Sequence, residues 1–332
     1  MGRRALTRIL ELDNRKILGV GIMSNILTRE NLHGIWAALI VPWTDDDRLD
    51  EDRFVHEIRA YANTGVQGIY TGGTTGEFYA QDDETFSRIA TLACREGERI
   101  RLPVQIGCTA LSTRIVRQRI RTAIHAGAAG IQIALPFWLE MYDAEIVEFI
   151  GDVTKSAEGR GVILYQTARA KRKVGAILLG RLAERFPTFI GIKDTGCSLE
   201  ELQAMISAAP GVAIFGGEHD LAARCQRGGR GAYCSITGLN ARRIAELYRL
   251  LSTNQFETAA PLQESIRRYT FELLLPMVRE GLWDSAVDRV QRVAGGVDVG
   301  LRCQRPYQSA TPQHVERLFD WCRKNTPELL PQ

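Results

Sequence analysis

Short apolar runs alternate with amphipathic stretches along the chain from Gly34 to about residue 252. The runs start roughly 20 to 35 residues apart, which is the length of a βα unit. They are continuously apolar, as in strands of a parallel sheet that helices cover on both faces. The predicted strands are 35–42, 68–71, 104–108, 131–135, 162–165, 189–193, 212–215 and 232–236.

The stretches between these runs have the spacing of helices with one apolar face. Eight βα units within about 220 residues favour an α/β fold of the (β/α)8 TIM barrel type. An open doubly wound sheet is the alternative, but its Gly-rich turn is missing after the first run, where Pro42-Trp43-Thr44 stands instead. The predicted helices are 52–63, 83–98, 113–126, 144–157, 177–186, 199–208 and 242–251.

Beyond residue 252 the strand rhythm ends and only helical patterns follow, at 256–278, 283–293 and 312–323. The sequence therefore predicts three parts. They are an N-terminal extension (1–32), a (β/α)8 barrel (33–252) and a C-terminal helical region (253–332). The first 22 residues are either a loose extension or precede the true translation start at Met23, because they lack the long apolar run of a signal peptide.

Composition narrows the functional classes. The net charge of +3 is too small to indicate a nucleic-acid partner, and no run of 18 apolar residues predicts a membrane span. The seven cysteines are scattered without a C-x-x-C pair, which is typical of a reduced cytoplasmic protein without disulfides or zinc. The sequence predicts neither a metal nor a cofactor.

A glycine- and threonine-rich segment, Gly73-Thr74-Thr75-Gly76, follows the second predicted strand. In a barrel, the residues after the strands build the active site. Glycines let consecutive backbone N–H groups point the same way and hold an anion, and the threonine hydroxyls add donors. A plain glycine-rich turn is the alternative interpretation.

Lys193 stands at the end of an apolar strand, where burial disfavours a charge unless the residue has a function. Desolvation is expected to lower its pKa and give a neutral amine able to attack a carbonyl. Tyr165 ends the preceding strand at the same end of the barrel, where a phenol can transfer protons. The alternatives are a lysine that extends past the strand end and a structural tyrosine. Asp194 should point to the opposite face.

Three motifs together resemble the dihydrodipicolinate synthase / N-acetylneuraminate lyase family. They are Gly73-Thr74-Thr75-Gly76-Glu77, Leu164-Tyr165-Gln166 and Ile190-Gly191-Ile192-Lys193-Asp194, and the similarity spans about residues 34–240. The resemblance implies a barrel, a Schiff-base lysine, no metal or cofactor, and a homotetramer or dimer.

The same resemblance assigns roles to matching positions. Lys193 would form the imine, Tyr165 would transfer protons, and Thr74 would relay them. The positions implied to bind the substrate are Thr75 at its carboxylate, and Gly73, Tyr233 and Gly217 along the pocket.

Two positions depart from the true synthases. Trp138 stands where they carry a second relay tyrosine, and Ala170 stands where they carry an arginine, with Arg169 as a possible substitute. The segment around Phe137, and Arg305-Pro306-Tyr307 in the tail, resemble the hydratase-aldolases of aromatic degradation. Trp138 would then stack on the substrate, or alternatively pack at a subunit interface.

The sequence thus predicts a class I aldolase or lyase that acts on pyruvate or a related 2-oxo acid and an aldehyde. The alternatives are a keto-deoxy-sugar-acid dehydratase or aldolase, an authentic 4-hydroxy-tetrahydrodipicolinate synthase, and a catalytically silent barrel that binds a 2-oxo acid. A metal at Glu218-His219-Asp220 and a phosphate near Gly229 are further, weaker possibilities.

Overall fold

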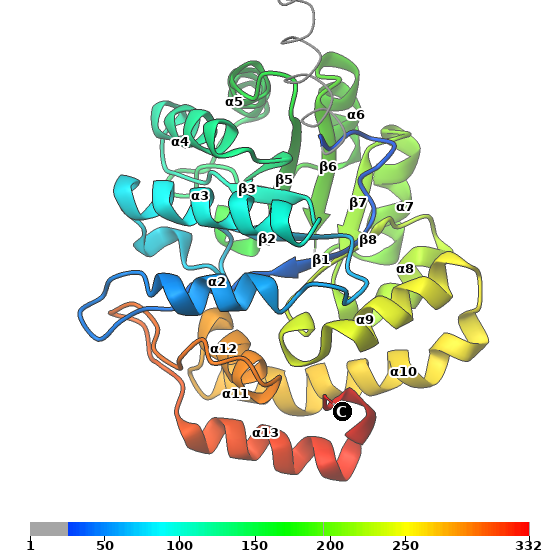
Figure 1. Ribbon diagram of the computed structural model, residues 1–332. Coiled ribbons are helices and arrows are strands. Elements are labelled where there is room, and N and C mark those ends of the chain that lie inside the picture. Colours follow the sequence, from blue (N-terminus) through cyan, green and yellow to red (C-terminus); the bar gives the residue numbers. More distant parts are fainter. Residues whose placement is uncertain (1–25, 195, 332) are drawn as a thin grey trace, which may run out of the picture.

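Eight parallel strands close into a barrel in chain order (Figure 1). The computed structural model describes residues 26–194 and 196–331, so the question of a start at Met23 lies outside them. The predicted (β/α)8 barrel is confirmed. The strands are β1 (Gly34–Ala38), β2 (Gly68–Thr71), β3 (Val104–Gly107), β4 (Gly130–Ile133), β5 (Gly161–Gln166), β6 (Phe189–Asp194), β7 (Ala213–Gly216) and β8 (Gly231–Cys234).

Helices surround the strands as predicted, with boundaries shifted by a few residues. The short α8 was not predicted, because six residues are too few to show a helical period. The barrel helices are α2 (Glu51–Arg59), α3 (Asp83–Arg99), α4 (Thr113–Ala126), α5 (Asp143–Ser156), α6 (Ala176–Arg185), α7 (Leu199–Ala208), α8 (Leu221–Gln226) and α9 (Thr237–Ser252). None of the helices within the described residues is long and apolar enough to cross a membrane.

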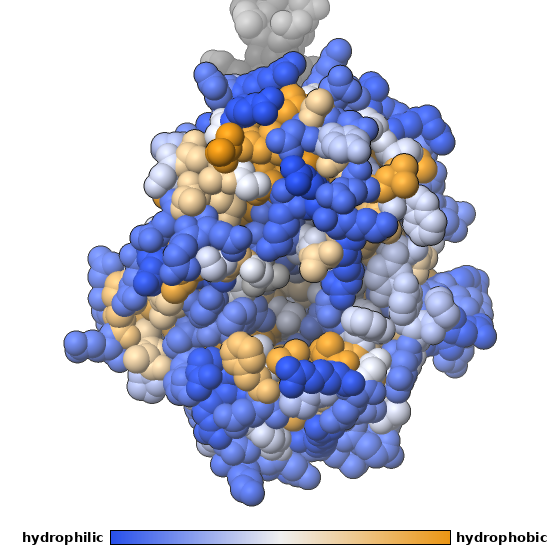
Figure 2. All heavy atoms as spheres, turned by 180° about the vertical axis from the view of Figure 1, so that it is seen from behind, coloured by the Kyte–Doolittle hydropathy of each residue, from blue (hydrophilic) through white to orange (hydrophobic). Residues whose placement is uncertain are grey.

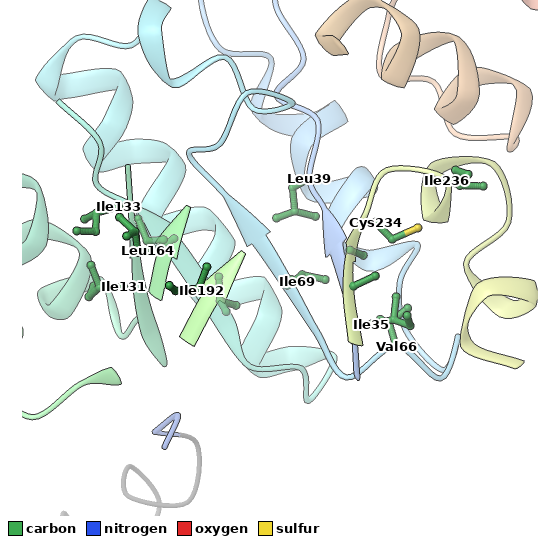
Figure 3. Close-up of a cluster of buried hydrophobic side chains, with 14 of the residues drawn as sticks. Ile35, Leu39, Val66, Ile69, Ile131, Ile133, Leu164, Ile192, Cys234 and Ile236 are labelled. Atoms are coloured by element: carbon green, nitrogen blue, oxygen red, sulfur yellow. The ribbon is translucent and has the colours of Figure 1, made fainter. Parts of the chain in front are cut away.

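Side chains alternate along each strand between the helix layer and the barrel interior. Ile133, Leu164 and Ile192, from three neighbouring strands, belong to the apolar cluster under the helices (Figure 3). The residues one position away face inward. The inward set includes Trp36, Tyr70, Ile163, Phe215 and Tyr233. The interior is therefore unusually rich in aromatic side chains.

Residues preceding β1 close the end of the barrel at which the strands begin. Leu27 and Leu32 are buried in the interior cluster, and the backbone N–H of Leu27 donates to Ala129 O at 3.0 Å. This part of the predicted extension is therefore packed against the barrel. Because this end is closed, the open end of the barrel lies at the carboxyl ends of the strands.

The C-terminal region packs beside α9 and extends along one side of the barrel (Figure 1). A π-helical stretch, Tyr269–Leu274, separates its first two α-helices. Its α-helices are α10 (Phe256–Arg268), α11 (Leu275–Arg279), α12 (Asp284–Ala294) and α13 (Pro312–Asn325). The face turned away from the view of Figure 1 is mainly hydrophilic, with separate apolar patches (Figure 2).

Two buried ion pairs join α12 to the barrel. Arg289 donates to Glu77, in the loop after β2, at 2.6 Å, and both side chains are fully buried. Arg292 pairs with Glu57 of α2. Glu77 also accepts from the backbone N–H of Gln304 at 3.0 Å and from the indole N–H of Trp43. One carboxylate thus connects the β2 loop, the first βα loop and the tail.

Replacing one partner of the Glu77–Arg289 pair should be strongly destabilising. We expect Arg289→Met to lower the free energy of unfolding by about 3–5 kcal/mol, because it leaves a buried carboxylate without its cation. Urea denaturation measures this loss. The double variant Glu77→Gln/Arg289→Met should lose clearly less than the sum of the two single variants. Additive losses would contradict a direct interaction between the two charges.

Candidate active site

Lys193 and Tyr165 lie side by side at the carboxyl ends of β6 and β5. The two strands pair in parallel with Tyr165 directly opposite Lys193. Since Ile192 and Leu164 face the helix layer, the alternation turns Lys193 and Tyr165 into the barrel. The structure therefore brings together the two residues that the sequence pairs.

Three tyrosine rings surround the Lys193 ammonium group. Its Nζ lies 4.1 Å from the ring centroid of Tyr165, 4.8 Å from that of Tyr70 and 5.3 Å from that of Tyr233. It also donates a hydrogen bond to Tyr70 Oη at 3.1 Å. Lys193 is only 6% exposed, so these rings replace much of the hydration that a charged amine needs.

The pKa of Lys193 is raised, not lowered. Burial lowers this pKa, but the oxygens of Tyr70 and Tyr165, the hydrogen bond to Tyr70 and the charge of Glu218 raise it by more. The expectation of a neutral amine at rest is therefore wrong for the unliganded site. It considered desolvation alone, whereas the tyrosines stabilise the ammonium form. Lys193 must lose a proton before it can attack a carbonyl.

The rings of Tyr70, Tyr165 and Tyr233 form a cage around the Lys193 amine. Tyr233 was predicted from the sequence and Tyr70 was not. Tyr70 was not singled out, although its period-2 position on β2 and its place three residues before Gly73 provide a signal. Tyr233 lies on β8, where its hydroxyl donates to Gln105 Oε1 at 2.7 Å. Burial raises the pKa of both phenols, so both are neutral near pH 7.

Asp194 points away from the cage, as expected from the strand alternation. It accepts a hydrogen bond from Gln166 Nε2 at 2.8 Å and lies 3.6 Å from Lys173 Nζ. Its charge is thus compensated outside the barrel, and it is not an ion-pair partner of Lys193.

The loop after β2 delivers Thr74 and Thr75 to the site. Gly72, with φ of +75°, begins the turn, and a Cβ there would lie 2.4 Å from Gly107 O. Only glycine fits this approach of two backbones. Thr75 lines the cavity that contains Lys193, whereas Thr74 lines this cavity and a second one beside it.

Asp288 of α12 was not found by sequence reasoning. It is 5% exposed, and its Oδ2 accepts a hydrogen bond from Thr75 Oγ1 at 2.6 Å. Burial is the main cause that raises the pKa of Asp288 to about 7, and the charges of Asp284 and Glu218 add to it. No local motif marks this residue, because α12 reaches the barrel only through the tertiary fold.

The second cavity, of about 270 Å³, is lined mainly by aromatic rings. Its walls include Phe78, Tyr79, Phe137, Trp283 and Tyr307, and the rings of Tyr79 and Tyr307 pack edge to face at 4.9 Å. Gly73, Thr74 and Tyr165 also line it. Because Thr74 and Tyr165 border both cavities, the aromatic cavity opens next to the lysine.

Arg169 lines the aromatic cavity, but its charge already has a partner. Its guanidinium lies 3.2 Å from Asp284 and 5.9 Å from the ring centroid of Trp283. Trp138 lines neither cavity and is 74% exposed, next to the exposed Leu139. Within one chain the structure thus does not bring Trp138 to the lysine, and its stacking on a substrate stays a prediction.

The remaining candidates lie around the end of β7. Gly217 is buried and precedes Glu218, whose side chain lines the lysine cavity. Asp220 binds Arg224 at 2.7 Å and is thus engaged in an ion pair. Across residues 26–194 and 196–331, no three His, Cys, Asp or Glu side chains group as they would around a metal ion.

Residues 31–322 match the sequence profile of the dihydrodipicolinate synthetase family. The chain belongs to this family. Its members are lyases that form or cleave carbon–carbon bonds, and family membership supports a Schiff-base aldolase type of chemistry. The likeness stated from the three motifs is therefore confirmed, and the chain is a lyase-type enzyme.

Relatives within the family differ in their reactions. The chain is 25% identical over 298 residues to an N-acetylneuraminate lyase of Clostridium perfringens, covering 88% of this chain and 99% of the relative. It is 29% identical over 232 residues to a 4-hydroxy-tetrahydrodipicolinate synthase of Anaplasma marginale, covering 69% and 75%. These identities are similar, so the comparison does not select a substrate.

Solved structures share the fold. The prophage protein YagE of Escherichia coli K12, in complex with pyruvate, has a TM-score of 0.80 and 24% identity, covering 88% of this chain and 98% of that protein. A 4-hydroxy-tetrahydrodipicolinate synthase of Methylacidiphilum fumariolicum has a TM-score of 0.81 and 18% identity, covering 90% and 98%.

The raised pKa of Asp288 predicts a pH-dependent loss of stability. The unfolded residue titrates near pH 4 and the folded one near 7, so its contribution to stability is fully present below pH 4 and is lost as the pH rises through 7. We expect Asp288→Asn to remove a decline of roughly 4 kcal/mol between these limits. Urea denaturation at pH 5 and pH 8 measures the part of this decline that falls between those two values, roughly 2.6 kcal/mol. A variant with the slope of the parent protein would contradict the assignment.

Proposed function

We propose that the protein is a class I aldolase or lyase that binds pyruvate, or a 2-oxo acid derived from it, as an imine on Lys193. The main support for this proposal is a lysine amine held among three tyrosines. The cavity between this amine and the threonine loop has space for a small acid. A catalytically silent barrel has no need for a buried lysine surrounded by three tyrosines, and that favours an active enzyme.

In the proposed reaction, Lys193 first passes its extra proton to water through the hydroxyl of Tyr70, which accepts from Nζ as it releases its own proton. The free amine attacks C2 of the 2-oxo acid, and the carbinolamine loses water to give an iminium. The C3–C4 bond then breaks and its electron pair moves into the iminium, which becomes an enamine. The Tyr165 hydroxyl accepts the proton of the C4 alcohol while it passes its own proton to water, so that an aldehyde leaves.

Protonation at C3 and attack of water at C2 complete the cycle and release pyruvate and the free lysine. The Tyr165 hydroxyl supplies the proton that C3 receives and takes one from the attacking water. The ring centroid of Tyr165 lies 4.1 Å from Lys193 Nζ. Run backwards, the same steps form the carbon–carbon bond.

Borohydride trapping tests the imine. We expect pyruvate plus borohydride to increase the protein mass by one reduced pyruvate, and Lys193→Ala to abolish this adduct. Lys173→Ala is the matched control, since Lys173 lies near the same strand end but pairs with Asp194 outside the barrel. An adduct that survives Lys193→Ala, or none on the unchanged protein, would refute the proposal.

For the aldehyde, we propose an aromatic or otherwise apolar compound. The cavity next to the lysine is walled by aromatic rings, which bind flat apolar groups by stacking and edge contacts. A keto-deoxy-sugar acid carries several hydroxyls that the aromatic rings leave without partners, so that only the remaining polar residues of the lining, such as Thr109, Thr167 and Ser285, would bind them. The aromatic cavity therefore favours a hydratase-aldolase type of substrate over a sugar acid.

The pairing of Arg169 also supports a role outside lysine biosynthesis. An arginine that receives the carboxylate of a second substrate should be free to do so, whereas Arg169 is bound to Asp284. An acidic partner would have to displace this carboxylate. A neutral aldehyde has no such requirement.

Loss of one aromatic wall should weaken aldehyde binding. With benzaldehyde and pyruvate in the condensation direction, we expect Phe137→Ala to raise the KM for benzaldehyde about tenfold, as for the loss of roughly 1.4 kcal/mol of aromatic contact. The KM for pyruvate should stay unchanged. The neighbouring Trp138→Ala is the matched control, because its ring lies outside the cavity. Preference for glyceraldehyde over benzaldehyde would instead favour the sugar-acid alternative.

The expected homotetramer or dimer and the cytoplasmic location stay predictions. Trp138, Leu139 and Tyr142 are exposed together after β4, in the segment whose interface packing is one interpretation of Trp138.

A further inference from the structure

The Thr75 hydroxyl has two acceptors but one proton. In the free site it donates to Asp288 Oδ2 at 2.6 Å. Under the proposed function, the same hydroxyl has to donate to the carboxylate of the 2-oxo acid. An ionised Asp288 therefore competes with the substrate for this proton, and a hydroxyl supplies only one.

No cation neutralises Asp288 within the described part of the chain. Its Oδ1 accepts from Gln291 Nε2 at 3.1 Å, and the residue forms none of the observed ion pairs. The charged and titratable groups that face it are Asp284 on its own helix, Glu218 after β7, Tyr70 on β2, Tyr269 in the π-helical stretch, and Lys193 across the cavity.

Most of these neighbours add no positive charge. The two phenols are neutral near pH 7, because burial raises the pKa of each. Glu218 and Asp284 are acidic, and Asp284 is engaged by Arg169. A second carboxylate entering beside Thr75 would thus meet an acidic wall on the side of α12, with Lys193 as the cation across the cavity.

We propose that Asp288 is a positioning residue that admits the carboxylate of the 2-oxo acid only when it is protonated, so that binding of the acid takes up one proton. This inference rests on the proposed function and names a further determinant of it.

Protonation reverses the direction of the hydrogen bond. The carboxylic acid of Asp288 donates to Thr75 Oγ1, which frees the Thr75 proton for the substrate carboxylate. It also removes the negative charge that would repel the substrate. The pKa of Asp288, raised by burial to about 7, puts this change within the physiological range.

The inhibition constant of lactate measures the effect without imine chemistry, because lactate keeps the carboxylate but has no carbonyl for Lys193 to attack. Lactate competes with pyruvate in the trapping assay. Below pH 7 its inhibition constant should be constant, and above pH 7 it should rise about tenfold for each pH unit. Lys193 does not titrate in this range, because its pKa is raised.

Asp288→Asn is the decisive variant. The amide has nearly the shape of the protonated acid and can donate to Thr75, but it does not titrate. We expect its inhibition constant for lactate to change less than about threefold between pH 6 and pH 9, against about a hundredfold for the unchanged protein. Glu218→Gln is the matched control. It should keep the pH dependence with a lower midpoint, because the charge of Glu218 raises the pKa of Asp288.

Calorimetry of lactate binding at pH 8, in buffers of different ionisation enthalpy, should show about one proton taken up, and none with Asp288→Asn. The proposal is overturned if Asp288→Asn keeps the pH dependence, or if the unchanged protein shows none. The proposed function fails separately, when pyruvate and borohydride give no adduct on Lys193. If the adduct forms but lactate binding lacks this pH dependence, the proposed aldolase function stands and the proposed role of Asp288 is rejected.

Discussion

The buried charge of Lys193 sets the terms for the rest of the site. An ammonium group at the mouth of an apolar barrel requires substitutes for water, and three tyrosine rings from β2, β5 and β8 provide them. These rings occupy the inner positions of their strands, where most barrels carry branched aliphatic residues. The polar contacts continue beyond the rings, since the Tyr233 hydroxyl donates a hydrogen bond to the buried Gln105 of β3. The aromatic character of the barrel interior thus serves, at these three positions, to hold one buried amine.

The C-terminal region forms part of the site and is more than an addition to the barrel. Thr270 and Leu274 of the π-helical stretch and Asp288 of α12 line the lysine cavity, while Trp283 lines the aromatic one. Extra residues in a helical turn often occur at functional positions, because they move a side chain out of the regular register. The barrel provides the amine, and the tail provides much of the wall against which a substrate is held.

How far the sequence predicts this arrangement depends on the range of the contacts. The pairing of Lys193 with Tyr165 follows from strand order and the two-residue period, which are local properties. The threonine loop carries its glycines in a short segment. Asp288 and the Arg169–Asp284 pair join residues separated by more than a hundred positions, and no local pattern encodes such contacts. The direction of the Lys193 pKa depended on the same kind of information, since Tyr70 lies 123 residues away.

The partners of Glu77 determine when an active site can exist during synthesis. This carboxylate lies in the loop that presents Thr74 and Thr75, yet it is held by Arg289 and by the backbone of Gln304. A nascent chain that has released all eight strands still lacks these partners. Domains can fold as they emerge, but these two contacts of the loop can form only after almost the whole chain has left the ribosome.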